Sequence, residues 1–244
     1  DGDRIYGIIR ATALNHGGRT SGVSVPNPNA QAVLITDALA KASVGPDSFS
    51  YVEAHGTGTE LGDPIEVTAL VKAFRSDAAD GIGVRNGKAC ALGSIKSNIG
   101  HLESAAGVAG LTKVLLQMKH KQLVPSLHSH EANPNIRFSD TPFVVQQALA
   151  SWDDEVTIED GRRVVHPRIA GLSSFGAGGA NAHVVVESYV DGRAFGSSDR
   201  DGRGEHPSPG RCEHIVVLSA RDPERLKAYA RRLLRFLQRE AVDQ

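Results

Sequence analysis

The chain has 244 residues, and its 27 Lys and Arg against 28 Asp and Glu give a formal net charge of −1. That balance excludes proteins that bind nucleic acid or anionic lipid through a strong overall charge. Cys90 and Cys212 form no CxxC pair, which argues against a zinc or disulfide framework. No run approaches the ~18 apolar residues of a transmembrane helix, and the first residues lack a signal peptide's apolar core. We therefore expect a cytoplasmic protein that is large enough to bury a core.

The first part of the chain alternates strand and helix patterns. Residues 4–10 have the apolar pattern of a strand, and a polar loop through residues 15–29 follows. Asn29 is placed to cap a helix that a Gly-Pro pair ends. A short strand at residues 50–54 then leads into a glycine-containing loop. Asp63, followed by proline, is typical of the start of a second helix.

The most distinctive element lies within residues 94–120. A helix is predicted from about residue 101 to residue 119, and its first two turns contain almost only Ser, Ala and Gly. Such a helix can approach its neighbours closely, although each Gly weakens it by ~1 kcal/mol relative to Ala. We expect it to be central to the fold, with small residues presented on several sides.

The last part of the chain contains further strands and a final helix. Strands are predicted at residues 143–146, 168–172 and 183–187, with a glycine-rich turn at residues 175–179. A linker rich in Gly, Ser, Pro, Arg and Asp follows, and then a short strand at residues 215–218. Asp222-Pro223 begins a basic amphipathic helix, whose apolar stripe fits packing on a neighbouring domain better than membrane binding.

Three loops contain residues that could take part in catalysis or binding. The first is residues 55–64, which read HGTGTELGDP. It follows a strand, and open α/β folds gather reactive groups at strand ends. An imidazole beside hydroxyls and backbone amides suits proton transfer and the binding of a polar chain. A histidine at a strand end can equally be structural.

The second loop is residues 96–103, KSNIGHLE, and the third is the turn FGAGG at residues 175–179. His101 would stand at the start of the buried helix, where the helix dipole favours a neutral ring that can donate to a developing oxyanion. The alternative is a hydrogen-bonded core histidine. The amides of the third loop could converge on an anion, although a glycine-rich turn need be nothing more.

Other ligand motifs fail on spacing. Residues 81–89 have one residue too many for a P-loop, and Ala89 stands where Ser or Thr must reach magnesium. The glycines at residues 176–179 lack the rest of the dinucleotide-binding spacing. The histidine pairs lack carboxylates or thiolates at ligand spacing, so we expect no metal site. His183 fits a structural role within a strand.

Three motifs in chain order resemble those of the β-ketoacyl synthases of modular polyketide synthases. Residues 52–66, VEAHGTGTELGDPIE, are similar to the first histidine motif of that family, and residues 93–107, GSIKSNIGHLESAAG, to the second. Residues 173–183, SSFGAGGANAH, resemble its C-terminal glycine loop. The resemblance covers residues 1 to about 188. The FGAGG form, with the tail from Ile215 onward, looks most like synthases whose acyltransferase acts in trans.

The resemblance implies the thiolase fold, an α/β architecture in which two similar halves stack in α-β-α-β-α layers. Members use a cysteine nucleophile in a Cys-Ser-Ser context in the N-terminal half, and neither cysteine of this chain has that context. We therefore expect residues 1–188 to be the C-terminal half of a ketosynthase domain. Residues 189–213 would be a flexible linker, and residues 214–244 the start of a post-ketosynthase α/β linker region.

The resemblance also implies a decarboxylative Claisen condensation of an acyl chain with malonyl-acyl carrier protein. His55 and His101 would stabilise the enolate, and Lys96 would set the electrostatics around His101. Asn98 and Glu103 would support this network. The expected substrate-binding residues are Thr57 and Thr59, which would hold the phosphopantetheine arm, and Phe175 and Ala177, whose amide at residue 177 would help to form the oxyanion hole.

The expected partners follow from the same resemblance. They are the N-terminal half with its cysteine, the acyl carrier protein and a second copy in a homodimer, with no nucleic acid and no membrane. No cofactor is expected to bind directly, since phosphopantetheine arrives as the substrate carrier. A half-fold would expose an apolar patch that needs a partner polypeptide. Two alternatives stay open: a synthase that only transfers acyl chains, and an inactive fragment that completes the fold. The intact His55 and His101 favour the condensing enzyme.

Overall fold

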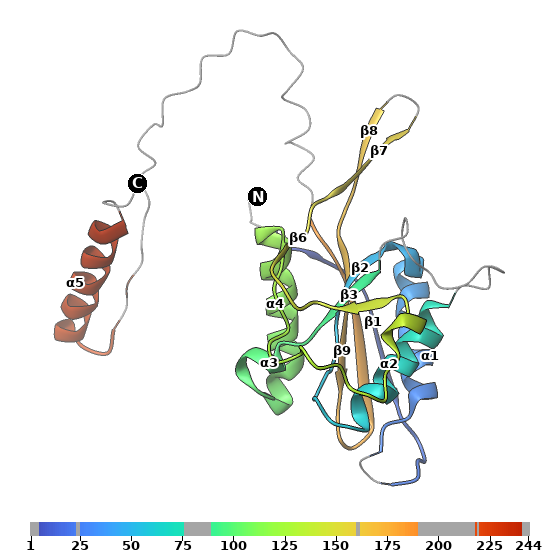
Figure 1. Ribbon diagram of the computed structural model, residues 1–244. Coiled ribbons are helices and arrows are strands. Elements are labelled where there is room, and N and C mark those ends of the chain that lie inside the picture. Colours follow the sequence, from blue (N-terminus) through green and yellow to red (C-terminus); the bar gives the residue numbers. More distant parts are fainter. Residues whose placement is uncertain are drawn as a thin grey trace. The chain divides into compact units, whose positions relative to one another are not determined.

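Figure 1 shows the computed structural model of the chain, which describes residues 5–22, 25–75, 89–159, 162–189, 218 and 220–240. The chain divides into two compact units, Asp1–Gly192 and Arg193–Gln244. All three glycine-containing loops belong to the first unit. In the described part of the chain, no helix has both the length and the apolar character needed to cross a membrane.

The first unit is built on a six-stranded sheet with the spatial order β1-β10-β9-β2-β3-β5. The strands are β1 (Ile8–His16), β2 (Phe49–Glu53), β3 (Cys90–Gly93), β5 (Phe143–Val145), β9 (Ile169–Phe175) and β10 (Ala180–Glu187). The neighbours from β9 to β5 are all parallel, whereas β10 is antiparallel to β9 and to β1. The carboxyl ends of β2, β3 and β9 therefore meet at one edge of the sheet.

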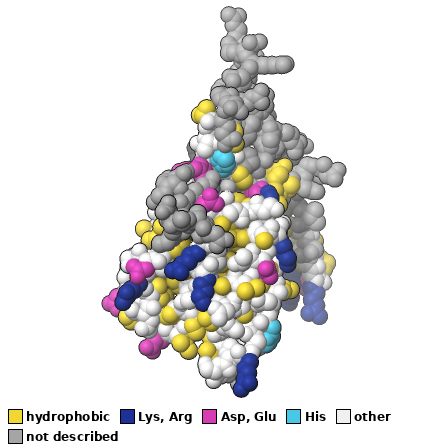
Figure 2. Space-filling model, turned by 90° about the vertical axis from the view of Figure 1, so that its right-hand side faces the viewer, with side chains coloured by type: hydrophobic (Ala, Val, Ile, Leu, Met, Phe, Trp, Pro, Cys, Tyr) yellow, Lys and Arg dark blue, Asp and Glu magenta, His cyan; other side chains and the backbone are white. Residues whose placement is uncertain are grey.

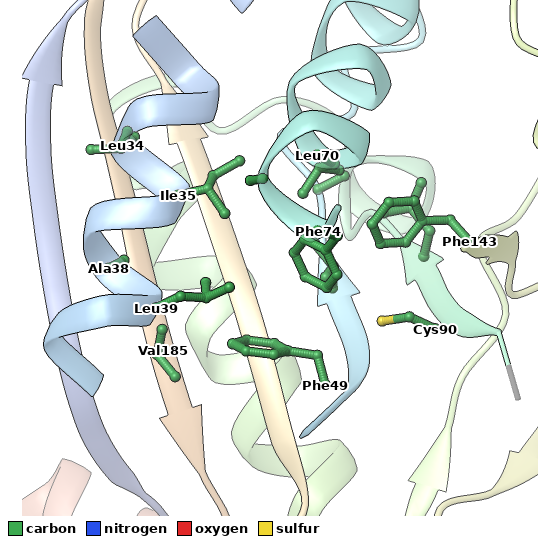
Figure 3. Close-up of a cluster of buried hydrophobic side chains, with 14 of the residues drawn as sticks. Leu34, Ile35, Ala38, Leu39, Phe49, Leu70, Phe74, Cys90, Phe143 and Val185 are labelled. Carbon is green, nitrogen blue, oxygen red and sulfur yellow. The ribbon is translucent and has the colours of Figure 1, made fainter. Parts of the chain in front are cut away.

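Helices cover both faces of this sheet, as Figure 1 shows: α1 (Pro28–Ala42) and α2 (Gly62–Phe74) on one face, and α4 (Ala106–His120) on the other. Under α1 and α2, Phe74 stacks edge-on against Phe49 and Phe143, with ring centroids 5.4 and 5.0 Å away (Figure 3). Under α4, a second cluster joins Val114 and Met118 to Tyr51 and Trp152. The first unit is thus a three-layer α-β-α body.

On the face that Figure 2 shows, the described surface of the first unit has no large patch of only positive or only negative side chains. That face is the right-hand side of Figure 1, where α1 and α2 lie, and its basic and acidic side chains are interspersed among hydrophobic ones. This distribution agrees with the balanced charge of the whole chain.

The N-terminal elements begin at other residues than the sequence predicted. The first strand occupies Ile8–His16, so it includes residues expected to lie in the following loop. The prediction that Asn29 caps α1 is wrong, because the cap is Asn27, whose side chain accepts from the amides of Asn29 and Ala30. α2 begins at Gly62, one residue before the expected cap, and Asp63 instead accepts from the amide of Gly58. The strand at β2 is confirmed.

The prediction of one helix starting near residue 101 is also wrong. A short helix α3 (Lys96–Ile99) and a 3-10 turn η2 (Glu103–Ala105) come before α4, which starts only at Ala106. Gly100 and Glu103 have positive φ angles of 77° and 49°, and an α-helix cannot continue through that conformation. His101 therefore lies in a loop.

The close approach of the small-residue helix to its neighbours is confirmed on one side. A Cβ added to Gly110 would stand 2.7 Å from Cδ1 of Leu172 and 3.2 Å from Cγ of Glu53. The opposite side of α4 is open within this unit, where Val108 is 68% and Leu116 is 47% exposed. Within this unit the helix is therefore buried on one face, and its open side agrees with the apolar patch expected of a half-fold.

Several short elements complete the first unit. They are η1 (Pro46–Ser48), η3 (Phe138–Asp140), and two antiparallel pairs, β4 (Gln122–Leu123) with β6 (Ala150–Ser151) and β7 (Glu155–Glu159) with β8 (Arg162–His166). Neither pair was predicted, and β7 and β8 extend away from the main sheet in Figure 1.

The second unit contains one described helix, α5 (Pro223–Glu240). It starts where the sequence predicted, and Oδ1 of Asp222 accepts from the amide of Arg225 at 2.8 Å. The predicted linker after Tyr189, the predicted strand before Leu218 and the P-loop-like residues 81–88 lie outside the described residues.

Candidate active site

Three loops meet at the carboxyl edge of the sheet, one after each of β2, β3 and β9. They bring together His55, His101 and Phe175, which are far apart in the sequence. The ring centroids of His55 and His101 are 5.4 Å apart, with the rings edge-on, and the centroids of His55 and Phe175 are 5.6 Å apart. The topology therefore assembles one site from the three motifs that the sequence singled out.

The hydrogen bonds of the two histidines fix the tautomer of each ring. Nδ1 of His55 accepts from the amide of Phe175 at 3.2 Å, and Nδ1 of His101 accepts from the amide of Glu103 at 2.9 Å. A nitrogen that accepts from a backbone N–H carries no proton, so each neutral ring has its proton on Nε2. The site therefore offers two Nε2–H donors.

The surroundings of His55 favour the neutral ring. Burial, together with the charges of Lys96 and His101, lowers the pKa of His55 to about 4. Lys96 is half-buried, and burial lowers its own pKa, against the opposing attraction of Glu66, Glu53 and Asp63. At neutral pH His55 is thus a hydrogen-bond donor without charge.

Glu66 on α2 holds the backbone of the first histidine loop. Its two carboxylate oxygens accept from the amides of His55 and Gly56, at 2.7 and 2.9 Å. Burial raises the pKa of Glu66 to about 7, although both hydrogen bonds oppose this shift. The sequence analysis did not select Glu66, even though it closes the motif that contains His55.

Glu53, the last residue of β2, connects the loop that contains His55 to the loop that contains His101. One carboxylate oxygen accepts from the amide of Ile95 at 2.5 Å, directly before Lys96. The other accepts from the hydroxyl of Tyr51 and from Nζ of Lys113. Because Glu53 is two residues from His55, one buried carboxylate sets the spacing between the two loops. The sequence analysis missed it as well.

Thr57 and Thr59 lie exposed beside His55. Their hydroxyl oxygens are 3.3 Å apart, and Oγ1 of Thr59 also accepts from the amide of Gly62 at 3.0 Å. Gly58 between them has a φ of 72°, which favours glycine at that position. Both residues are exposed at the edge of the site.

The two residues expected to support the network make different contacts. The backbone amide of Glu103 donates to Nδ1 of His101. Glu103 itself is exposed. The side-chain oxygen of Asn98 accepts from the hydroxyl of Ser97 at 3.2 Å. The structure therefore assigns the orientation of His101 to a backbone group.

The glycine turn after β9 presents amides at the surface of the site. The amide of Gly176 donates to the carbonyl of Ala180 at 2.7 Å, and the amide of Gly179 donates to that of Gly176 at 2.9 Å. Within the described residues, the amides of Ala177 and Gly178 donate to no acceptor. Both residues are exposed, so these two N–H groups are available to an anionic oxygen.

Two other residues considered from the sequence lie away from this chemistry. Cys90 is buried at the start of β3, and burial raises the pKa of its thiol well above the usual range, which makes it a poor nucleophile. His183 is fully buried in β10, with Nδ1 3.0 Å from the hydroxyl of Ser173. Over the ranges that the structure describes, no cluster of three or more His, Cys, Asp or Glu could hold a metal ion.

Two family models together match most of this chain. The family described as "Beta-ketoacyl synthase, C-terminal domain" matches residues 6–130, and that described as "Ketoacyl-synthetase C-terminal extension" matches residues 132–242. The chain belongs to the β-ketoacyl synthase family. The first match ends before β5, β9 and β10, so both matched regions contribute strands to the sheet of this ketosynthase part.

Relatives of high identity are far longer than this chain. Polyketide synthase PksL of Bacillus subtilis is 52% identical over 241 residues, which are 98% of this chain and 5% of that protein. Polyketide synthase ThaG of Burkholderia thailandensis is 56% identical over 236 residues, 96% of this chain and 4% of that protein. This ketosynthase chain therefore spans about a twentieth of these relatives.

Solved ketosynthases have the same fold. The oxazolomycin ketosynthase domain OzmH KS7 of Streptomyces albus JA3453 matches with a TM-score of 0.80 and 47% identity, over 99% of this chain and 38% of that one. The ketosynthase from module 6 of the bacillaene synthase of Bacillus subtilis matches with a TM-score of 0.74 and 40% identity, over 97% and 36%. The expected family and the expected thiolase-like α/β fold are confirmed.

Proposed function

We propose that this chain forms the C-terminal half of a ketosynthase that elongates polyketides by decarboxylative Claisen condensation. The carrying observation is the pair of rings, His55 and His101, whose centroids are 5.4 Å apart and whose Nδ1 atoms both accept from backbone amides. Two Nε2–H donors side by side suit an oxygen that becomes negative during the reaction.

The first chemical step is the loss of carbon dioxide from malonyl-acyl carrier protein. The bond between the carboxylate carbon and the α-carbon breaks, and its electron pair moves onto the thioester oxygen as an enolate. His55 and His101 donate to that oxygen and stabilise its charge. Lys96 contributes by keeping His55 neutral, because its positive charge disfavours a second cation nearby.

The second step forms the new carbon–carbon bond. The α-carbon of the enolate attacks the acyl thioester on the cysteine of the N-terminal half, and the thioester oxygen becomes an oxyanion. The amide N–H of Ala177 would donate a hydrogen bond to that oxyanion. The tetrahedral intermediate then collapses and expels the cysteine thiolate. Thr57 and Thr59 would hold the phosphopantetheine arm, and the ring of Phe175 would pack beside it.

The same proposal names the partners. They are the N-terminal half that carries the cysteine, the acyl carrier protein and a second copy of the complete domain, in the cytoplasm. Large apolar side chains support a polypeptide partner, since Ile9 is 55%, Leu14 80% and Val108 68% exposed. The FGAGG form of the glycine turn favours a synthase whose acyltransferase acts in trans.

The test uses a complete ketosynthase domain that contains this chain. Incubation with an acyl thioester and malonyl-acyl carrier protein should give a β-ketoacyl product longer by the two carbons that malonyl donates, visible by mass spectrometry. A domain that becomes acylated and passes the chain on without extending it would be a transfer-only synthase. Absence of acylation and of product would favour the inactive, fold-completing role.

A further inference from the structure

The end of β1 clamps the glycine turn that carries the Ala177 amide. The ring of His16 lies against this turn, with Nε2 2.9 Å from the carbonyl oxygen of Gly178. Nδ1 of the same ring accepts from the amide of Gly18 at 3.0 Å, so Nε2 carries the proton and donates to Gly178. The next residue, Gly17, donates its amide to the carbonyl of Gly179 at 2.7 Å.

The contact between His16 and the turn requires glycine at residue 179. The residues after His16 are in turn held by Asn27. Gly179 has a φ of 95°, and a Cβ there would lie 2.9 Å from Cε1 of His16, so the ring rests directly on this residue. The side chain of Asn27 donates to the carbonyl of Gly17 at 2.7 Å and also caps α1. The turn is therefore held from outside by the start of α1.

A short chain of hydrogen bonds links the His16 ring to the direction of the Ala177 amide. The peptide group that contains the Gly178 carbonyl also contains the Gly179 amide, which donates to the carbonyl of Gly176. The Gly176 carbonyl and the Ala177 amide in turn share one rigid, planar peptide group. Rotation of the Gly178 carbonyl away from His16 would therefore rotate the Ala177 amide as well.

We propose that His16 is a positioning residue for the oxyanion hole, acting through the Gly178 carbonyl on the direction of the Ala177 N–H. This inference rests on the proposed function, since it assigns the Ala177 amide to the acyl thioester oxygen. It separates two steps of the reaction. Acylation of the cysteine depends on this amide, whereas malonyl decarboxylation depends on His55 and His101.

Two substitutions of His16 test its two hydrogen bonds separately. His16→Gln keeps a side-chain N–H donor that can reach the Gly178 carbonyl. His16→Asn keeps an acceptor for the Gly18 amide but is too short to reach Gly178. In the complete ketosynthase domain, we measure cysteine acylation by an acyl thioester through intact mass, and decarboxylation through carbon dioxide release.

His16→Asn should slow acylation about 10- to 100-fold, the usual effect of a misplaced reacting group, with decarboxylation changed less than about threefold. His16→Gln should recover most of the acylation rate. His120→Asn is the matched control, because His120 is exposed at the end of α4, and it should leave both rates unchanged. If His16→Asn does not fold, His16→Phe keeps a ring on Gly179 without the donor and should show the same loss.

Equal behaviour of the Gln and Asn variants would overturn the proposal, as would an equal loss of acylation and decarboxylation. An unchanged acylation rate in His16→Asn would do the same. These results differ from a failure of the proposed function, in which the unsubstituted domain would itself show no acylation or no decarboxylation.

Discussion

Nζ of Lys113 on α4 lies 2.8 Å from Oε2 of Glu53, and both side chains are buried, at 6% and 1% exposure. The same carboxylate accepts from the amide of Ile95. One ion pair therefore joins α4 to the end of β2 and to the loop that leads to Lys96. The relative positions of the two histidine loops depend on this contact.

Substitution of Lys113 by Met should destabilise the complete domain, because it leaves the carboxylate of Glu53 buried without its cation. Removal of one partner from a buried ion pair costs about 3–5 kcal/mol in the free energy of unfolding. Denaturant unfolding measures this loss. Lys41→Met, at an exposed position of α1, should change the free energy by less than about 0.5 kcal/mol. A Lys113→Met domain as stable as this control would contradict the role of the pair.

Glu66 should make stability depend on pH. Its pKa is about 7 in the folded protein against a usual 4.5, so the folded state retains a proton that the unfolded state releases. The stability that Glu66 contributes is therefore complete below pH 4.5 and is lost as the pH rises through 7. Relative to Glu66→Gln, the unsubstituted domain should lose about 3 kcal/mol over this range. Denaturant unfolding at several pH values checks this, and a constant difference between the two proteins would argue against it.

Lys96→Ala should raise the pKa of His55 from about 4, because the neighbouring positive charge is one cause of its depression. Protonation of His55 is disfavoured by folding, so the stability that its neutral form contributes is lost as the pH falls from 6.5 through 4. NMR titration of the histidine ring protons measures the pKa, with Lys41→Ala as the control. Lys96→Ala should lower the rate of malonyl decarboxylation by a larger factor than it lowers the fraction of folded domain. An unchanged His55 titration would remove Lys96 from this role.

The sequence predicted the site better than the elements that hold it. His55 follows a predicted strand, so its loop could be placed from the sequence. The strand β3 before the second loop was not predicted, and His101 was expected at the start of a helix. The roles of Glu53 and Glu66 could not be predicted, since a carboxylate looks solvent-facing until α4 and α2 are packed over it. The tautomers of the histidines likewise depend on amides of Phe175 and Glu103 that only the fold brings near.

Element boundaries failed where two local signals compete. Asn27 and Asn29 are both good caps, and the structure uses Asn27 because Pro28 then occupies the first helical turn. The small residues before Ala106 favour a helix, but Gly100 and Glu103 adopt positive φ angles. The hairpin of β7 and β8 lacks the large apolar face that marks a buried strand.

The chain expressed alone should associate or aggregate, because the open face of α4 and the exposed side chains of β1 are apolar. Exposed apolar area costs ~25 cal/mol per Å², which amounts to several kcal/mol for a few hundred Å². Co-expression with an N-terminal ketosynthase half should give a soluble pair. Sedimentation velocity decides between these outcomes, and a compact, folded monomer of 25.8 kDa would show that no partner is required.

The central claim is that His55 and His101 act on malonyl and not on the acyl chain. The direct measurement compares carbon dioxide release with cysteine acylation in complete domains that carry His55→Ala, His101→Ala or, as a control, His120→Ala. Each of the first two should lose about 100-fold or more in carbon dioxide release, as expected when a donor to a developing oxyanion is removed. Acylation should stay largely intact in all three. Normal carbon dioxide release by the His55→Ala domain would contradict the account.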